Sequence, residues 1–139
     1  MGWGIVYFET GGGKVPAEEF LAACPTTIKG RFYAVLGVVR DAPPPQFGGG
    51  GYWEAMHGDM GGYYEIRLTG PGRRQYRLFC VLDNSNPSGL RKRGFEKPQI
   101  AAITGMIKAS GKKFSERDYA KVRRLGDEYA AELPRRIAG

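Results

Sequence analysis

The sequence is poor in residues that hold metals or form cross-links. It contains one histidine and two cysteines, Cys24 and Cys80, which lie in apolar surroundings without CxxC spacing. Zinc sites and disulfide scaffolds need several such residues at defined spacing. We therefore expect no metal site and no cofactor, and we expect both cysteines to be buried, reduced thiols.

Long hydrophobic runs are also missing. No stretch reaches the roughly 18 apolar residues that identify a membrane-spanning helix. The N-terminus lacks the basic region and apolar core of a signal peptide. The sequence therefore predicts a cytoplasmic protein that does not enter a membrane.

The chain nevertheless contains enough apolar material for one core. Of its 139 residues, 42% are hydrophobic and 12% are aromatic, and this length is too short for two ordinary domains. The Gly/Pro-rich segment 41–51 predicts a flexible connector inside the domain, because neither side of it could build a core alone. We expect residues 1–139 to form a single domain.

Hydrophobic periodicity predicts an α+β domain with the element order βααβββα and an antiparallel-rich sheet. Between the last two strands, residues 83–98 predict a long basic loop. Ser115 and Asp118 fit the capping box of a final helix. The expected elements are a strand at 5–8, a helical hairpin over 17–39, strands at 63–69, 76–82 and 100–107, and a C-terminal helix that ends at Pro134.

The net charge of +7 is distributed unevenly along the chain. Residues 1–90 carry eight basic and eight acidic side chains, whereas residues 91–139 carry 13 basic and six acidic ones. Such an excess indicates an anionic partner, most commonly a polyphosphate backbone. A solvated basic helix and a surface that docks an acidic protein segment are the alternatives.

Two sequence stretches resemble a known family. They are Gly58-Asp59-x-Gly61-Gly62-Tyr63-Tyr64-Glu65-Ile66-Arg67 and Gln75-Tyr76-Arg77-Leu78-Phe79, followed by a lysine-bearing loop with Lys108, Lys112 and Lys113. This pattern resembles RelE/HigB-type toxins of type II toxin-antitoxin systems, with the distinctive part in residues 56–82. The chain departs from the family in its longer loop at 83–98 and in Met106, where relatives have an aromatic residue.

The resemblance implies a toxin that enters the ribosomal A site, cuts messenger RNA and so inhibits translation. Cleavage would proceed by attack of a 2′-hydroxyl on the neighbouring phosphate, leaving a cyclic phosphate, without metal. The expected partners are the mRNA, the ribosome and a small antitoxin that carries a helix-turn-helix. A non-catalytic basic module that binds RNA or ribosomes on the same scaffold is the alternative.

Arg67 and Arg77 are the strongest catalytic candidates. If the hairpin turn has an odd number of residues, such as 70–74, they face each other across the sheet and form a like-charge pair that suits a bound phosphate. Alternatively, each pairs with Glu65 or another acid. Glu65 itself is a candidate base, or a neutralising partner of Arg67. His57 is a candidate proton donor, a phosphate contact or a plain surface residue.

Lysines, arginines and tyrosines elsewhere complete the candidate site. We expect Lys108 to take part in catalysis. Lys108, Lys112 and Lys113 flank Gly111 in a loop ahead of a helix, and they could clamp a phosphate backbone or merely be solvated. The predicted RNA-binding set comprises Lys112, Lys113, Arg91, Lys92, Arg93 and Tyr63. Tyr64 and Tyr76 could also stack on bases, although Tyr64 belongs to an apolar face and favours the core.

Overall fold

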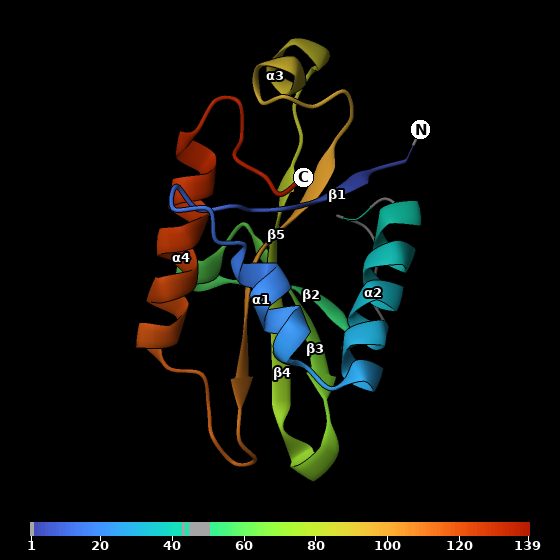
Figure 1. Cartoon of the computed structure of the whole chain (residues 1–139), viewed down its shortest axis with the longest axis vertical. Coiled ribbons are helices and arrows are strands. Elements are labelled where there is room, and N and C mark those ends of the chain that lie inside the picture. The colour runs from blue at the N-terminus through green and yellow to red at the C-terminus, as the bar shows by residue number, and fades with distance from the viewer. Residues whose placement is uncertain (1, 43, 45–50) are drawn as a thin grey trace.

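The computed structural model describes residues 2–42, 44 and 51–139 (Figure 1). It is an α+β domain whose five-stranded mixed sheet has the order β1-β5-β4-β3-β2. No described helix is both long enough and apolar enough to cross a membrane. The elements are β1 (Gly4–Tyr7), α1 (Pro16–Ala23), α2 (Thr26–Asp41), β2 (Trp53–Ala55), β3 (Tyr63–Thr69), β4 (Gln75–Asp83), α3 (Pro87–Lys92), β5 (Gln99–Lys108) and α4 (Glu116–Ala131), with short 3-10 turns at Gly58–Met60 and Pro71–Arg73.

The sheet is antiparallel except where β1 runs parallel to β5. The element order departs from the predicted βααβββα at two places, because β2 and α3 were not expected. Strand β2 has only three residues, too few to produce a period-two pattern, and it depends on pairing with β3. Most of the predicted connector 41–51 lies outside the described residues, and Asp41 still belongs to α2.

The prediction of a loop over residues 83–98 is wrong, because this segment contains the helix α3. Pro87 occupies the first turn, and the Asn86 side chain accepts a hydrogen bond from the Gly89 backbone N–H at 2.7 Å. Both are standard signals for a helix start. The helix has only six residues, so its one buried apolar side chain, Leu90, gives no visible periodicity.

Helices α1 and α2 cover one face of the sheet and form the main core. Phe20, Phe32 and Leu36 of these helices pack against Ile66 and Leu78 of the strands. Cys24 and Cys80 are free and buried, as predicted, and burial raises the pKa of the Cys80 thiol to about 12. This face is therefore closed by apolar side chains.

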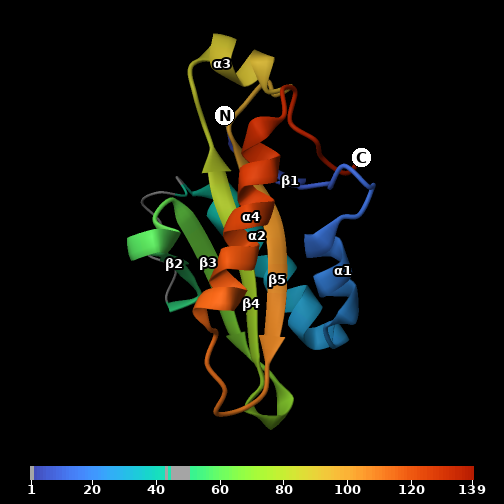
Figure 2. The same cartoon turned by 90° about the vertical axis from the view of Figure 1, so that its left-hand side faces the viewer.

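Helix α4 covers only part of the opposite face (Figure 2). Its Val122 packs with Phe79, and its Tyr129 packs with Ile103. The predicted capping box is confirmed, since the Ser115 side chain accepts from the Asp118 N–H and Asp118 accepts from the Ser115 N–H. Because α4 begins only at Glu116, the end of the sheet that carries the β3–β4 hairpin extends beyond it (Figure 2).

Gly105 in β5 is a packing requirement. A Cβ at this position would lie 2.2–2.5 Å from ring atoms of the buried Phe20. We expect Gly105→Ala to lower the free energy of unfolding by about 1–3 kcal/mol through overpacking. Gly30→Ala, on the exposed face of α2 with no atom near the new Cβ, should instead raise it by up to about 1 kcal/mol. Urea unfolding of both variants measures the difference, and equal effects would contradict the packing argument.

Candidate anion-binding site

The β3–β4 hairpin places two arginines side by side. Its turn spans residues 70–74, closed by the Gly70 N–H donating to the Arg74 carbonyl at 2.9 Å. Arg67 is thereby paired with Arg77 across the strands. The predicted register is confirmed. Arg67 is 42% exposed, whereas Arg77 lies beside the start of α4, with its guanidinium carbon 5.3 Å from the centre of the Phe114 ring.

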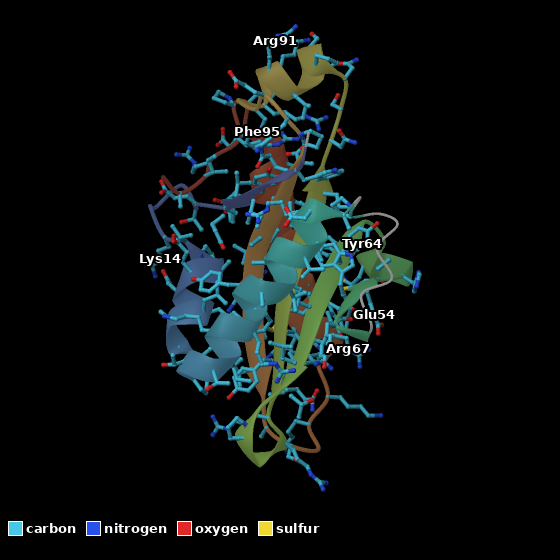
Figure 3. The ribbon with its side chains drawn as sticks, turned by 90° about the vertical axis from the view of Figure 1, so that its right-hand side faces the viewer. Lys14, Glu54, Tyr64, Arg67, Arg91 and Phe95 are labelled. Carbon is cyan, nitrogen blue, oxygen red and sulfur yellow. The ribbon has the colours of Figure 1, made fainter. Side chains whose placement is uncertain are left out.

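Each arginine is held by its own carboxylate. Arg67 Nη1 lies 3.1 Å from Glu54 Oε1, and Arg77 Nε lies 3.1 Å from Glu65 Oε1. Figure 3 shows Glu54 and Arg67 projecting toward each other from the edge of the sheet. The alternative interpretation of ion-paired arginines therefore holds for the free protein. Glu65 pairs with Arg77 and not with Arg67, whose partner comes from the unpredicted strand β2.

The two ion pairs differ in exposure. The side chains of Arg67 and Glu54 are 42% and 44% exposed, whereas those of Arg77 and Glu65 are 12% and 14% exposed. Burial is the main cause that raises the pKa of Glu65, and Arg77 and Arg67 oppose this rise. The exposed Arg67–Glu54 pair is screened by water and can open at low cost, while the mostly buried Arg77–Glu65 pair is a fixed part of the structure.

Two hollows meet at Arg77. The first has a volume of about 450 Å³ and the second about 430 Å³. Both are lined by Gln75 and Arg77, and together they gather five cationic side chains. The first is also lined by Arg31, Gly51, Tyr52, Arg67 and Thr69, and the second by Gly111, Lys112, Lys113, Phe114 and Tyr119.

Lys112 and Lys113 thus lie beside Arg77, but Lys108 has another position. Its Nζ is 3.0 Å from Asp118 Oδ2 and 5.9 Å from the centre of the Phe114 ring. The backbone hydrogen bond from Ser115, together with Lys108, holds the pKa of Asp118 below its usual value. Lys108 lines neither hollow, and its contacts fasten the first turn of α4 to the end of β5.

His57 and the three tyrosines do not line the two hollows. His57 is exposed and lies beyond the Ala55 end of β2, away from Arg67. Tyr63 packs under α4, where its hydroxyl occupies the space that a side chain at position 126 would need. Tyr64 stacks on Trp53 with ring centres 4.9 Å apart, and Tyr76 is buried. The preference for a core position of Tyr64 is confirmed.

Arg91, Lys92 and Arg93 lie at the opposite end of the molecule from the hairpin (Figure 1). Strand β4 separates the two ends, and its nine residues span about 26 Å at roughly 3.3 Å per step. Arg91 and Lys92 are exposed on α3, whereas Arg93 forms an ion pair with Asp83. These residues therefore belong to a second basic surface and not to the hollows at Arg77.

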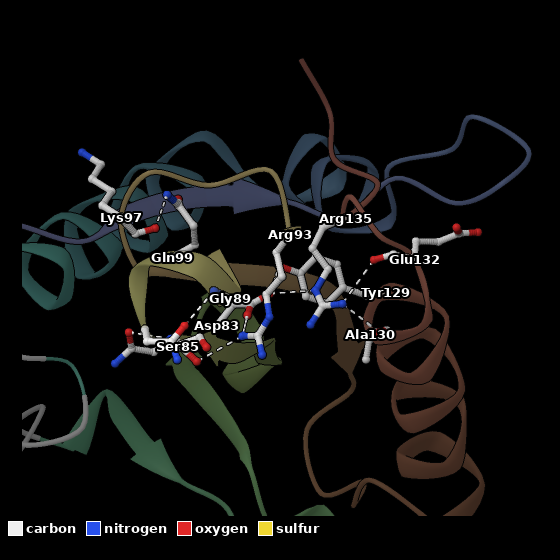
Figure 4. A network of polar contacts seen from close by, with 12 residues as sticks. Asp83, Ser85, Gly89, Arg93, Lys97, Gln99, Tyr129, Ala130, Glu132 and Arg135 are labelled. Carbon is white, nitrogen blue, oxygen red and sulfur yellow. Dashed lines mark hydrogen bonds and ion pairs between the residues drawn. The ribbon is translucent and has the colours of Figure 1, made fainter. Parts of the chain in front are cut away.

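Asp83 is the centre of a buried polar network (Figure 4). Its side chain is 4% exposed and accepts hydrogen bonds from Arg93 Nη1, from the Tyr129 hydroxyl at 2.7 Å and from Arg135 Nε at 2.9 Å. The network joins the end of β4 to α3, to α4 and to the segment after α4. We infer a structural role, because its donors and acceptor satisfy one another.

Sequence reasoning missed Arg31, Gln75, Tyr52, Phe114 and Tyr119 as parts of the site. Only Gln75 had a usable signal, since it shares a strand face with Arg77 by period-two alternation. Tyr52 lies just before β2 and Arg31 lies on α2, with the Arg31 Cζ atom 5.7 Å from the Tyr52 ring centre. No local pattern reports such a long-range contact.

The described part of the chain holds no group of three or more His, Cys, Asp or Glu side chains that could bind a metal ion. The cationic side chains of the two hollows are suited instead to an anion, and two guanidinium groups on one face match a phosphate. Comparison with known proteins adds no family, because no family model, curated protein or solved structure matches this chain. The resemblance to RelE/HigB toxins accordingly stays a prediction.

Proposed function

We propose that the two hollows bind the phosphate backbone of RNA and that the protein is the toxin of a type II toxin-antitoxin system that cuts messenger RNA on the ribosome. The observation that carries this proposal is the pairing of Arg67 with Arg77 across β3 and β4, in two adjoining hollows that Lys112 and Lys113 also line. A cluster of cations that lines a hollow is a typical binding site for a polyanion.

The proposed reaction is transfer of phosphate within the RNA chain. The 2′-oxygen forms a bond to phosphorus, the bond from phosphorus to the 5′-oxygen breaks, and the product keeps a 2′,3′-cyclic phosphate. The transition state carries additional negative charge on the phosphate oxygens, which Arg67 and Arg77 would stabilise. No carboxylate of the described residues lines either hollow, so charge stabilisation is assigned the main part of the rate acceleration.

Proton transfer has fewer candidates than the sequence indicated. His57 lies outside both hollows, so we assign protonation of the departing 5′-oxygen to Lys112 or Lys113. The 2′-hydroxyl proton would pass to water. Glu65 lines neither hollow, and its role in this scheme is to orient the Arg77 guanidinium through the contact at 3.1 Å.

A non-catalytic module that binds RNA or ribosomes is the second candidate. The ion pairs of Arg67 and Arg77 favour it, because carboxylate partners reduce the net charge that a scissile phosphate would meet. Both candidate functions use the two hollows at Arg77 and an anionic RNA partner. In the proposed toxin-antitoxin system, an antitoxin with a helix-turn-helix covers the two hollows in the cell.

Cleavage mapping distinguishes the two candidates. We expect the purified protein to cut mRNA on translating ribosomes within the A-site codon and to leave cyclic phosphate ends, as read by primer extension and end-group analysis. EDTA should not stop the cut when polyamines keep the ribosomes intact. Binding without cleavage would contradict the enzyme and favour the non-catalytic module.

Salt dependence tests the phosphate contact itself. Release of counterions by five cations predicts that log K for a short single-stranded RNA falls against log salt concentration with a slope of about −3.5. Lys112→Ser with Lys113→Ser should make the slope shallower by about 1.4. Arg91→Ser with Lys92→Ser, a matched change at the other end of the molecule, should leave it unchanged. An affinity independent of salt in fluorescence anisotropy would remove the electrostatic argument.

A further inference from the structure

The Arg77 side chain lines both hollows and lies between them. A phosphate bound at Arg77 on β4 has one hollow on each side, because the first hollow extends over the neighbouring strand β3 and the second toward the segment that follows the other neighbour, β5. In a nucleic acid, each phosphate also has one nucleoside on each side. Volumes of about 450 and 430 Å³ are within the range of small-molecule sites.

The first hollow has an exposed aromatic ring. Tyr52 is 46% exposed, which is unusual for a large aromatic side chain in this protein. The guanidinium of Arg31 lies over the ring at 5.7 Å from its centre. A tyrosine that is supported by a cation and open to solvent can stack on a base.

The second hollow has a pair of aromatic rings. The centres of Phe114 and Tyr119 are 6.3 Å apart with a tilt of 33°. The buried ring of Phe79 contacts both edge-on, at 6.4 Å and 6.2 Å. These contacts fix the two rings, so little conformational entropy is lost when a base packs against them.

We propose that the hollows are two nucleobase sites, with one base on Tyr52 and the next base against Phe114 and Tyr119, on either side of the phosphate at Arg77. This inference rests on the proposed RNA-binding function and adds that the smallest recognised unit is a dinucleotide. Aromatic stacking is tolerant of base identity, so the two sites recognise the presence of bases more than their sequence.

The test measures binding of small probes that cannot be cut. The probes are the 2′-O-methyl dinucleotide ApA and two analogues in which either base is removed, titrated by isothermal calorimetry at low salt. We expect each analogue to bind about tenfold more weakly than ApA. Tyr52→Ser should weaken ApA binding about tenfold, and should have little effect on the analogue that lacks the base facing it.

The matched control is Tyr33→Ser. Tyr33 is 48% exposed on α2, close to the 46% of Tyr52, and it lines neither hollow, so its replacement should leave ApA affinity unchanged. Tyr119→Ser tests the second site after its melting temperature is checked; if it fails to fold, the analogue without that base still tests the site.

Two results would separate failure of this inference from failure of the proposed function. If ApA and both analogues bind equally and Tyr52→Ser changes nothing, the base sites are wrong while the phosphate site stands. If neither ApA nor a longer single-stranded RNA binds at low salt, the proposed function itself is wrong.

Discussion

Replacement of Arg67 or Arg77 by alanine should nearly abolish RNA cleavage and growth arrest. In the proposed reaction, loss of one positive charge at the reacting phosphate is expected to cost about 2–4 kcal/mol of transition-state stabilisation, as for the loss of one oxyanion donor. The double variant should lose less than the sum of the two, because both side chains would act on one phosphate. Primer extension on translating ribosomes measures the cut.

The stability of the two variants should differ. If the facing arginines only repelled each other, either replacement would leave the stability nearly unchanged or raise it. Each arginine has a carboxylate partner, however, so each replacement also removes an ion pair. Arg67→Ala removes an exposed pair and should change the free energy of unfolding by less than about 0.5 kcal/mol. Arg77→Ala leaves the mostly buried Glu65 without its partner and should lower stability more clearly.

Glu54→Gln is the matched control for Arg67. It removes the carboxylate that holds Arg67 at 3.1 Å and keeps the arginine. If Arg67 acts on phosphate, this variant should still cut RNA, and its salt-dependent binding should strengthen. If Arg67→Ala and Arg77→Ala are folded at the assay temperature and still cut RNA at the wild-type rate, the assignment of both arginines is wrong.

The Asp83→Asn substitution should cause the largest loss of stability among single polar changes. The carboxylate accepts hydrogen bonds from Arg93, Tyr129 and Arg135 through both of its oxygens, and an amide has only one oxygen and no charge. Breaking a buried ion pair on one side typically costs about 3–5 kcal/mol. Because Arg93 is partly exposed, we expect a loss of about 3 kcal/mol in urea unfolding. Asp127→Asn, an exposed position on α4, is the matched control and should have little effect.

The same network sets a dependence of stability on pH. Burial alone would raise the pKa of Asp83, but hydrogen bonds from Tyr129, Arg135 and Arg93 together hold it below the usual value. A depressed pKa means that the stabilisation is complete above the unfolded-state value of about 3.9 and is lost as the pH falls below it. As the pH falls, the melting temperature of Asp83→Asn should therefore decrease less than that of the wild-type protein. If the melting temperatures of the two proteins depend on pH in the same way, the role of Asp83 is contradicted.

Local sequence signals determined the α+β class, the helical hairpin, the capping box at Ser115 and the opposition of Arg67 and Arg77. These features depend on neighbours along the chain. The register, for example, follows from a turn with an odd number of residues, because side chains of a strand alternate with a period of two. The basic excess after residue 90 is likewise a property of composition.

Only the tertiary structure decided which charges belong together. Arg91, Lys92 and Arg93 are close to Lys108 in the charge pattern of the sequence, yet β4 and β5 carry α3 to the far end of the sheet. Glu54 reaches Arg67 through β2, which forms only against β3, and Tyr52 precedes that strand. Such contacts join residues that no local period relates, because they result from packing of one element on another.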